Sequence, residues 1–301
     1  MFYFLTRQVL GSKTEIQLSE YEYAYIKSAK AGLLGALHIE EKFDLLLSNY
    51  IEIENELLRL SNENMLYYPG GWSELHDQRR IVSRRMNNLL SSCRLYKDQL
   101  LHLSSLLKGA EFKKNVKLWT NEAYDKSQSY RIMESLRNFV QHRGEPIHSL
   151  SCSSKWVSGP TGRKLFTTVV PILKPGKLKE EGDFKSEVLK EVAERDSIDL
   201  KPIIREYVGH LSAIHKKIRD TLRCDVQMWE NELYARIEQF EKEFPQERIV
   251  GLAAVSMKER GRPIEWIPIF KDFMEDRQRF ENRSKNLENL SSWCVTSDNI
   301  Q

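Results

Sequence analysis

The chain has 301 residues, of which 41% are hydrophobic and 30% charged, a composition that supports a buried core and argues against global disorder. With only 14 glycines and 9 prolines, long helices are favoured over a turn-rich all-β fold. The formal net charge of +3 excludes a global electrostatic argument for nucleic-acid binding, so any such surface must be local.

The first predicted region, residues 1–148, is an N-terminal helical bundle. Residues 2–10 alternate loosely between apolar and polar types, which predicts a strand or an interfacial segment. From about Glu20, and again after Ser73, apolar residues recur every three or four positions and predict two long helices. The segment Tyr68-Pro69-Gly70-Gly71 predicts a turn between them, with Ser73 as N-cap of the second helix. The two helices are therefore expected to form an antiparallel hairpin.

The second long helix is expected to stop near Gly109, and a third helical stretch is predicted over residues 110–143. A break is expected within residues 125–129. Gly144 and Pro146 end the stretch, because glycine favours the left-handed position after a helix and proline cannot continue one.

Two further regions are predicted. Residues 149–182 are rich in Ser, Gly, Pro and Lys and contain one β-like run, Lys164–Leu173. Residues 183–301 are predicted to be helical, with a short β-hairpin formed by Ile249–Met257 and Ile264–Ile269. The predicted fold class is therefore mainly α, a helical bundle with long antiparallel helices plus a small β element.

The four cysteines bear on location and on metal binding. They lie far apart in sequence without a C-x-x-C pair, so the sequence predicts neither a metal site nor a cofactor. Reduced, mostly buried thiols are expected, and disulfides in a secreted protein are the alternative. No apolar run is long enough to cross a bilayer, and the N-terminus lacks a basic region and a cleavage site, so a cytoplasmic location and no membrane partner are expected. The four residues are Cys93, Cys152, Cys224 and Cys294.

The segment Leu136–His142 is the one stretch whose residue types and order suggest a reaction. Arg137 and Asn138 are followed, after three intervening residues, by His142. This pattern resembles the signature of the HEPN superfamily, in which an Arg, often followed by Asn, Asp or His, precedes a His in a compact helical bundle. The resemblance rests on these few residues near the middle of the chain.

The chemistry of these side chains agrees with RNA cleavage that needs no metal. The 2′-OH of RNA attacks the adjacent phosphorus if one group moves a proton and a cation stabilises the phosphorane. Histidine does acid–base work near neutrality, and arginine presents a fixed fork of donors to phosphate oxygens. The expected roles are phosphate contact for Arg137, proton transfer for His142 and positioning for Asn138.

The spacing of the motif places a condition on the site. Residues five apart on a regular helix are separated by about 140° of rotation, so Arg137 and His142 do not share one face. Either the helix is irregular here or another chain completes the site, and the resemblance implies the latter, a homodimer through the motif-bearing helices. Arg143 adds a further candidate phosphate contact. Some HEPN toxins carry a modifiable tyrosine two residues after the His, where this chain has Gly144.

Other basic and aromatic residues have a structural interpretation beside a functional one. Arg84 and Arg85 belong to a basic stretch that either binds an RNA backbone or is a solvated helix face, which is favoured. His148 could assist the motif, although a loop histidine is usually just exposed. Four tryptophans are expected in the core or an interface rather than as base-stacking platforms: Trp72, Trp119, Trp229 and Trp266.

Three hypotheses for the function follow. The first is a metal-independent, dimeric HEPN-like endoribonuclease acting on RNA, with a role in stress response or antiviral (phage) defence by family analogy and with a regulatory protein partner left open. The second is a non-catalytic HEPN-like RNA-binding or scaffold protein. The third is a helical partner subunit of a larger complex.

Overall fold

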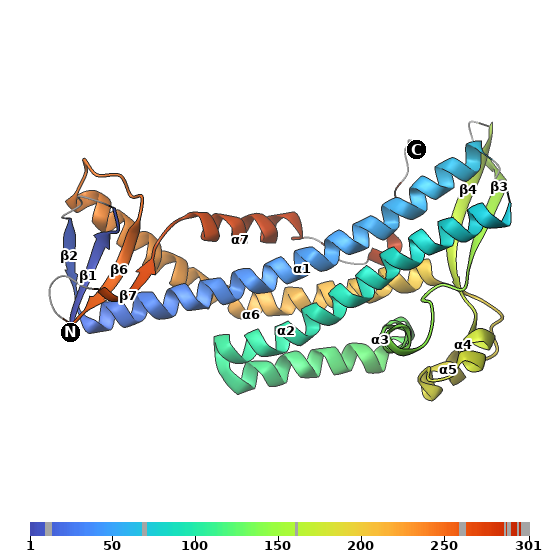
Figure 1. The fold of residues 1–301 in the computed structure, drawn as a ribbon, viewed down its shortest axis with the longest axis horizontal. Helices are drawn as coiled ribbons and strands as arrows, with labels where there is room; N and C mark the ends of the chain where they lie inside the picture. The colour runs from blue at the N-terminus through green and yellow to red at the C-terminus, as the bar shows by residue number, and fades with distance from the viewer. Residues whose placement is uncertain are drawn as a thin grey trace. The chain divides into compact units, whose positions relative to one another are not determined.

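A computed structural model describes residues 1–9, 14–67, 71–159, 162–258, 263–285, 287, 290–293 and 295 (Figure 1). Over these residues the chain is mainly helical with small antiparallel sheets, which confirms the predicted fold class. It divides into two compact units, and the divisions fall inside the three long helices except for the last, which follows the final α-helix. The first unit contains Met1–Glu41, His102–Phe112 and Lys216–Lys285, and the second contains Lys42–Leu101, Lys113–His215 and Asn286–Gln301.

The helices are α1 (Glu20–Leu66), α2 (Trp72–Lys126), α3 (Gln128–His142), α4 (Pro175–Glu181), α5 (Ser186–Val192), α6 (Leu200–Glu243) and α7 (Asp272–Arg283), followed by a 3-10 turn at Leu290–Ser292. The strands are β1 (Phe2–Arg7), β2 (Glu15–Leu18), β3 (Ser149–Gly159), β4 (Gly162–Leu173), β5 (Ile198–Asp199), β6 (Leu252–Met257) and β7 (Pro263–Pro268).

The first unit contains a four-stranded antiparallel sheet with the order β2-β1-β6-β7. The strand predicted within residues 2–10 is its central strand β1, on which Leu5 faces Ile16 of β2 on one side and Ala254 of β6 on the other. Leu5 and Ala254 are fully buried. Phe4 and Leu5 therefore belong to the core, whereas Met1 and Phe2 are exposed.

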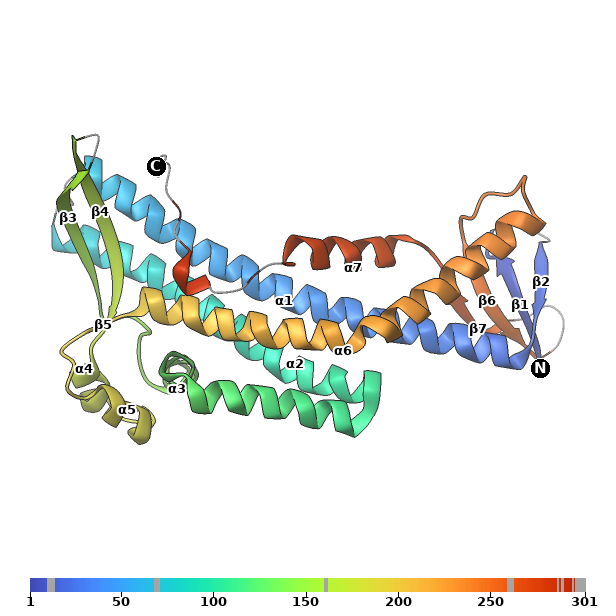
Figure 2. The same ribbon diagram turned by 180° about the vertical axis from the view of Figure 1, so that it is seen from behind.

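The helices of the first unit pack antiparallel. Arg236 of α6 pairs with Glu22 near the start of α1, and Arg219, earlier on α6, pairs with Glu40, later on α1. Between these pairs the helices approach closely, because a Cβ on Gly32 would lie 2.6 Å from the ring of Trp229. Figure 2 shows α7 running beside these two helices.

The second unit contains the expected antiparallel hairpin of α1 and α2. Glu52 pairs with Arg85, and Asn64 contacts Gln78, so the register runs in opposite directions along the two helices. Deeper in this unit, the His215 ring stacks on Phe43 at 3.8 Å between centroids. Its Nδ1 shares a 2.9 Å hydrogen bond with the hydroxyl of Tyr96.

The start of α2 differs from the expectation. The helix begins at Trp72 with Gly71 as N-cap, so the predicted capping role of Ser73 is wrong and no side chain caps this end. The predicted end of the second helix near Gly109 is confirmed, because the backbone of α2 leaves the helical conformation there (φ 78°, ψ −167°) and two helices meet at this kink. The predicted break within residues 125–129 is confirmed at Ser127, where α2 ends and α3 begins. Residues 68–70 of the predicted turn lie outside the described residues.

The second sheet consists of the β3–β4 hairpin and a short β5 in the second unit. The predicted strand Lys164–Leu173 lies within β4. The predicted hairpin near the C-terminus corresponds to β6 and β7, which belong to the other sheet, and its loop 259–262 lies outside the described residues. The two β-like segments of the sequence therefore form separate sheets.

The cysteines correct another expectation. Cys93 is buried, but Cys152 and Cys224 are exposed, so "mostly buried" is wrong for the described thiols. Burial raises the pKa of the Cys93 thiol well above its usual range. Cys294 lies outside the described residues.

Candidate functional site

The motif lies on α3, which is held at its start by a capping serine. The Ser127 hydroxyl accepts a 3.1 Å hydrogen bond from the backbone N–H of Tyr130 and donates one of 2.7 Å to Glu206 of α6. Further along, Glu134 accepts a 2.6 Å hydrogen bond from the Tyr207 hydroxyl and pairs with Lys97 of α2. These contacts fix α3 to both neighbouring helices of the second unit.

The apolar face of α3 orients the motif. Met133, Leu136 and Phe139 are fully buried, at the three- and four-residue spacing of a helix face. The helix is regular as far as His142, and the backbone N–H of Arg143 then bonds the carbonyl of Phe139 at 2.9 Å. Since the helix has no irregularity, Arg137 and His142 remain about 140° apart around its axis.

Two of the three motif side chains are in direct contact. The Nη1 of Arg137 donates a 3.0 Å hydrogen bond to the amide oxygen of Asn138, and the half-buried Arg137 has an enclosed Nε without a hydrogen-bond partner among the described residues. Asn138 thus contacts the guanidinium directly, and its role in positioning stays a prediction. His142 is exposed at the last residue of the helix.

The residues after the motif have structural constraints of their own. Arg143 is exposed and pairs with Asp183, another exposed side chain. Gly144 allows a close approach, because a Cβ there would lie 2.7 Å from the ring of Phe139. A larger side chain at this position would clash with this ring.

His148 is half-buried, so the expectation of a merely exposed loop histidine is wrong. Its Nδ1 accepts a 2.8 Å hydrogen bond from the backbone N–H of Lys174. Burial, followed by the charges of Lys177, Lys174 and Arg79, lowers the pKa of His148 to about 4. The ring is therefore neutral at pH 7, and it supports the loop after α3 instead of donating protons.

The basic stretch of α2 divides into different roles. Arg79 donates a 3.1 Å hydrogen bond to the carbonyl of Ile147 and so ties α2 to the loop after the motif. Arg85 pairs with Glu52 of α1, which favours the structural interpretation for this residue. Arg84 is exposed. The positive charge around this loop was not predicted. Arg79 and the lysines of α4, which supply it, are distant from the loop along the chain.

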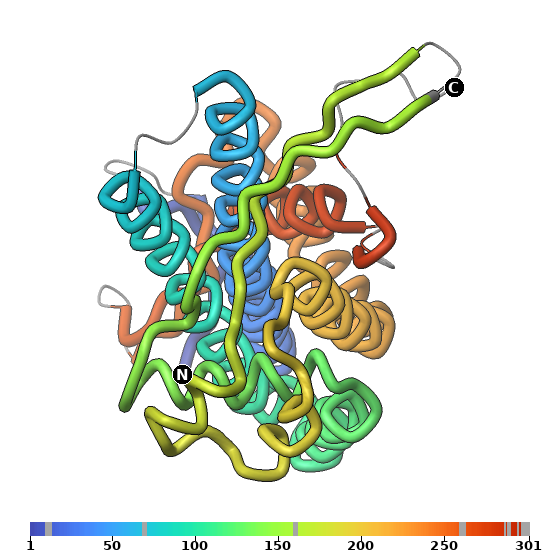
Figure 3. The backbone as a smooth tube through the Cα atoms, turned by 90° about the vertical axis from the view of Figure 1, so that its right-hand side faces the viewer, coloured from blue at the N-terminus to red at the C-terminus, as the bar shows by residue number. Residues whose placement is uncertain are grey.

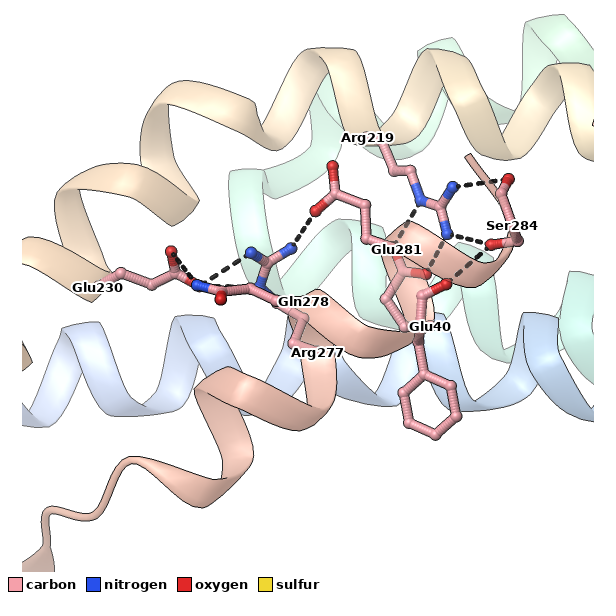
Figure 4. A network of polar contacts seen from close by, with 8 residues as sticks. Glu40, Arg219, Glu230, Arg277, Gln278, Glu281 and Ser284 are labelled. Carbon is pink, nitrogen blue, oxygen red and sulfur yellow. Dashed lines mark hydrogen bonds and ion pairs between the residues drawn. The ribbon is translucent and has the colours of Figure 1, made fainter. Parts of the chain in front are cut away.

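A separate cluster of charged residues surrounds a cavity of about 280 Å³ in the first unit (Figure 4). Arg219 contacts Glu40 at 2.5 Å, and Arg277 contacts Glu230 at 2.8 Å and Glu281 at 2.7 Å. Each of these guanidinium groups is thus matched by a carboxylate, and the cluster has the character of a helix-packing network.

The tryptophans also correct the sequence interpretation. Trp72 and Trp266 are exposed, so a core position is wrong for both, while Trp119 and Trp229 are half-buried. Trp156 on β3, which the sequence did not single out, is exposed as well. The apolar–polar alternation of a strand sequence does not show whether another element covers either face of the strand.

In the described part of the chain, no group of three or more His, Cys, Asp or Glu side chains is arranged to hold a metal ion. No helix among the same residues combines the length and apolar character that crossing a membrane requires. No protein-family model matches the sequence, and searches of curated proteins and of solved structures find no similar chain.

Proposed function

We propose that the chain is a metal-independent endoribonuclease of the HEPN type. The observation that carries the proposal is the motif on α3, where Asn138 holds the guanidinium of Arg137 and His142 is exposed at the end of the same helix. An arginine fixed by a neutral amide retains its charge for a phosphate, and an exposed histidine can reach a substrate.

In the proposed reaction, His142 takes the proton of a ribose 2′-OH while that oxygen bonds to the adjacent phosphorus. Arg137 stabilises the negative charge of the phosphorane. The bond from phosphorus to the 5′-oxygen then breaks, and the leaving oxygen takes a proton from water, whose hydroxide is neutralised by the His142 imidazolium. The products are a 2′,3′-cyclic phosphate and a 5′-hydroxyl.

The regular geometry of α3 supports a site built from two chains. One helix presents Arg137 and His142 on different sides, so one chain offers a single proton-transfer histidine next to another chain's arginine. A symmetric dimer through α3 would contain two such composite sites, each with His142 of one chain and Arg137 of the other.

The test is cleavage of total RNA in excess chelator by wild type, Arg137→Ala and His142→Ala. General acid–base catalysis typically contributes roughly 10²- to 10⁴-fold, and a loss of that size is expected for His142→Ala. The matched controls are Arg94→Ala and His102→Ala, at other arginine and histidine positions on α2, and both should cleave like wild type. Equal cleavage by all five proteins, or an absolute need for a metal, contradicts the proposal.

Mixing the two inactive variants tests the shared site. In a heterodimer of Arg137→Ala and His142→Ala, one composite site keeps both side chains, so random exchange should restore about a quarter of wild-type activity. A mixture as inactive as its components would contradict a site shared between chains.

A second candidate is a protein that binds RNA without cutting it. The stretch 146–179 favours this function, since it contains six lysines and arginines and no aspartate or glutamate. RNA binding without cleavage by the purified wild type would support this candidate over the first.

A further inference from the structure

The β3–β4 hairpin is a long two-stranded ribbon with little cover. Its strands pair from Ser149 and Ile172 at the base to Gly159 and Gly162, whereas β5 joins β4 only at Ile172 and Leu173. Figure 3 shows the outer part of the ribbon extending past the helices. From position 151 to 158, and again from 162 to 166, each side chain is exposed.

The base of the ribbon is attached to the second unit. Ser61 of α1 accepts a 3.1 Å hydrogen bond from the backbone N–H of the buried Val169, and Asn64 contacts Cys152. This attachment lies at the inner part of the ribbon, and neither Trp156 nor Phe166 takes part in it. Their side chains therefore need a different explanation.

The outer part of the ribbon combines aromatic rings with cations. Trp156 is 55% exposed and Phe166 is 50% exposed, which is costly for such large apolar groups unless a partner covers them. Lys155, Arg163 and Lys164 lie among them. The whole stretch 146–179 lacks acidic residues, so its sequence carries no carboxylate to oppose a polyanion.

Rings and cations occur together on both faces. Lys155 is paired across the strands with Phe166, and Trp156 with Leu165, so neighbouring pairs point to opposite faces. The guanidinium of Arg163 lies 5.6 Å from the centre of the Trp156 ring. Each face thus offers one aromatic ring for stacking and at least one positive charge beside it.

We propose that this ribbon is an arm that binds single-stranded RNA, with bases stacked on Trp156 and Phe166 and phosphates held by Lys155, Arg163 and Lys164. Exposed aromatic side chains interleaved with cations are the means by which proteins hold single strands, because every base has a stackable face. The choice of RNA over DNA rests on the proposed function. The arm follows His142 closely in sequence, since β3 begins at Ser149, seven residues later (149 − 142 = 7).

Binding is measured by fluorescence anisotropy of a labelled single-stranded RNA in excess chelator, with full-length His142→Ala so that the probe stays intact. In that background, Trp156→Ala should weaken binding about 5- to 150-fold, the range for loss of one stacked base. The matched control is Trp266→Ala, at a similarly exposed tryptophan of β7, which should bind unchanged.

Salt dependence isolates the cations. For single strands, the slope of log K against log salt is about −0.7 per phosphate contact, so changing Lys155, Arg163 and Lys164 to Gln should flatten it by about 2. Lys113→Gln with Lys114→Gln, at exposed positions of α2, controls for a general change of surface charge. Circular dichroism of each variant checks that the fold is retained.

Three results would overturn the arm: no binding of single-stranded RNA, unchanged affinity in the arm variants, or equal losses in arm and control variants. Binding of the arm to anionic vesicles or to a second copy of the chain in place of RNA would overturn it as well. The outcome is separable from the nuclease proposal. If RNA binding depends on the arm but the wild type does not cleave RNA, only the nuclease proposal is wrong. If the wild type cleaves RNA but binding does not depend on the arm, only the arm proposal is wrong.

Discussion

Two arginines, one in each unit, have different kinds of partner. In the first unit, Arg277 is buried and pairs with two carboxylates, Glu230 and Glu281, on α6 and α7. In the second unit, the hydrogen bond of Arg137 goes to the neutral amide of Asn138. A guanidinium matched by carboxylates serves helix packing, while one held by an amide keeps its charge for a ligand.

The same contrast holds for longer stretches. On α6 of the first unit, Arg236 pairs with both Glu22 and Glu232. In the second unit, residues 146–179 contain cations without a single acidic residue. The paired arginines join helices, whereas the sequence of this stretch contains no carboxylate next to its cations.

The largest expected effect is the loss of a paired arginine. Arg277→Met leaves Glu230 and Glu281 without their partner in a partly desolvated site, and the free energy of unfolding should fall by about 3 kcal/mol. Arg137→Met, which removes a hydrogen bond to an exposed amide, should cost about 1 kcal/mol or less. Urea denaturation measures both, and similar losses in the two variants would erase the contrast.

A cation of the first unit without a carboxylate should behave in the opposite way. Lys30 is buried, its Nζ lies 3.7 Å from the centre of the Phe273 ring and 4.2 Å from that of Phe270, and no hydrogen bond reaches it from the described residues. Burial lowers the pKa of Lys30 to about 8. Lys30→Met should therefore stabilise the protein at pH 7 by about 1–2 kcal/mol, after the lost cation–π contact is subtracted.

The pH dependence gives the control for Lys30. Its folded pKa lies below the unfolded value of about 10.4, so the unfolded chain holds more protons between about pH 8 and 10.4 and wild-type stability rises with pH there. The advantage of Lys30→Met should shrink over this window. A constant advantage from pH 7 to 10.4 would mean that the charge is not its cause.

A smaller effect is expected at His148, whose folded pKa of about 4 lies below the unfolded value of about 6.5. As pH falls from 6.5 to 4, the unfolded chain takes up the proton first, and stability should fall by about 1 kcal/mol because the ring is only half-buried. His148→Gln, which keeps an acceptor for the Lys174 N–H, should remove this part of the pH dependence. If the free energy of unfolding of His148→Gln falls between pH 6.5 and pH 4 as much as that of the wild type, this assignment is wrong.

Local periodicity explains which parts of the fold were predictable. The long helices α1 and α6 and the break at Ser127 follow from signals within a few turns of sequence. The pairing of β1 with β6 joins segments at opposite ends of the chain, and neither segment contains a local signal that identifies the strand with which it pairs. The cap of α2 was misplaced because Ser73 is a good capping residue but the helix begins one residue before it.

The candidate site shows the same limit. The motif itself is local, and Arg137 and Asn138 are neighbours in the sequence whose side chains are in contact. The surroundings of His148 come from α2 and α4, distant segments whose approach only the fold determines. Trp156 has the alternation of an ordinary strand, and its exposure depends on the absence of a third strand over the outer part of the described ribbon.

The smallest effect on stability is expected at Arg143, where the two interpretations of a surface charge differ most clearly. Its pair with Asp183 is exposed on both sides, so Arg143→Ala should change the free energy of unfolding by about 0.5 kcal/mol or less. If Arg143 contacts phosphate, the same change should flatten the salt slope of RNA binding by about 0.7. Asp183→Asn, suited to φ 59°, removes the competing carboxylate and should strengthen binding a few-fold. Opposite shifts in affinity at nearly constant stability would place Arg143 with the charges kept for RNA, and unchanged affinity in both variants would return it to the solvated surface.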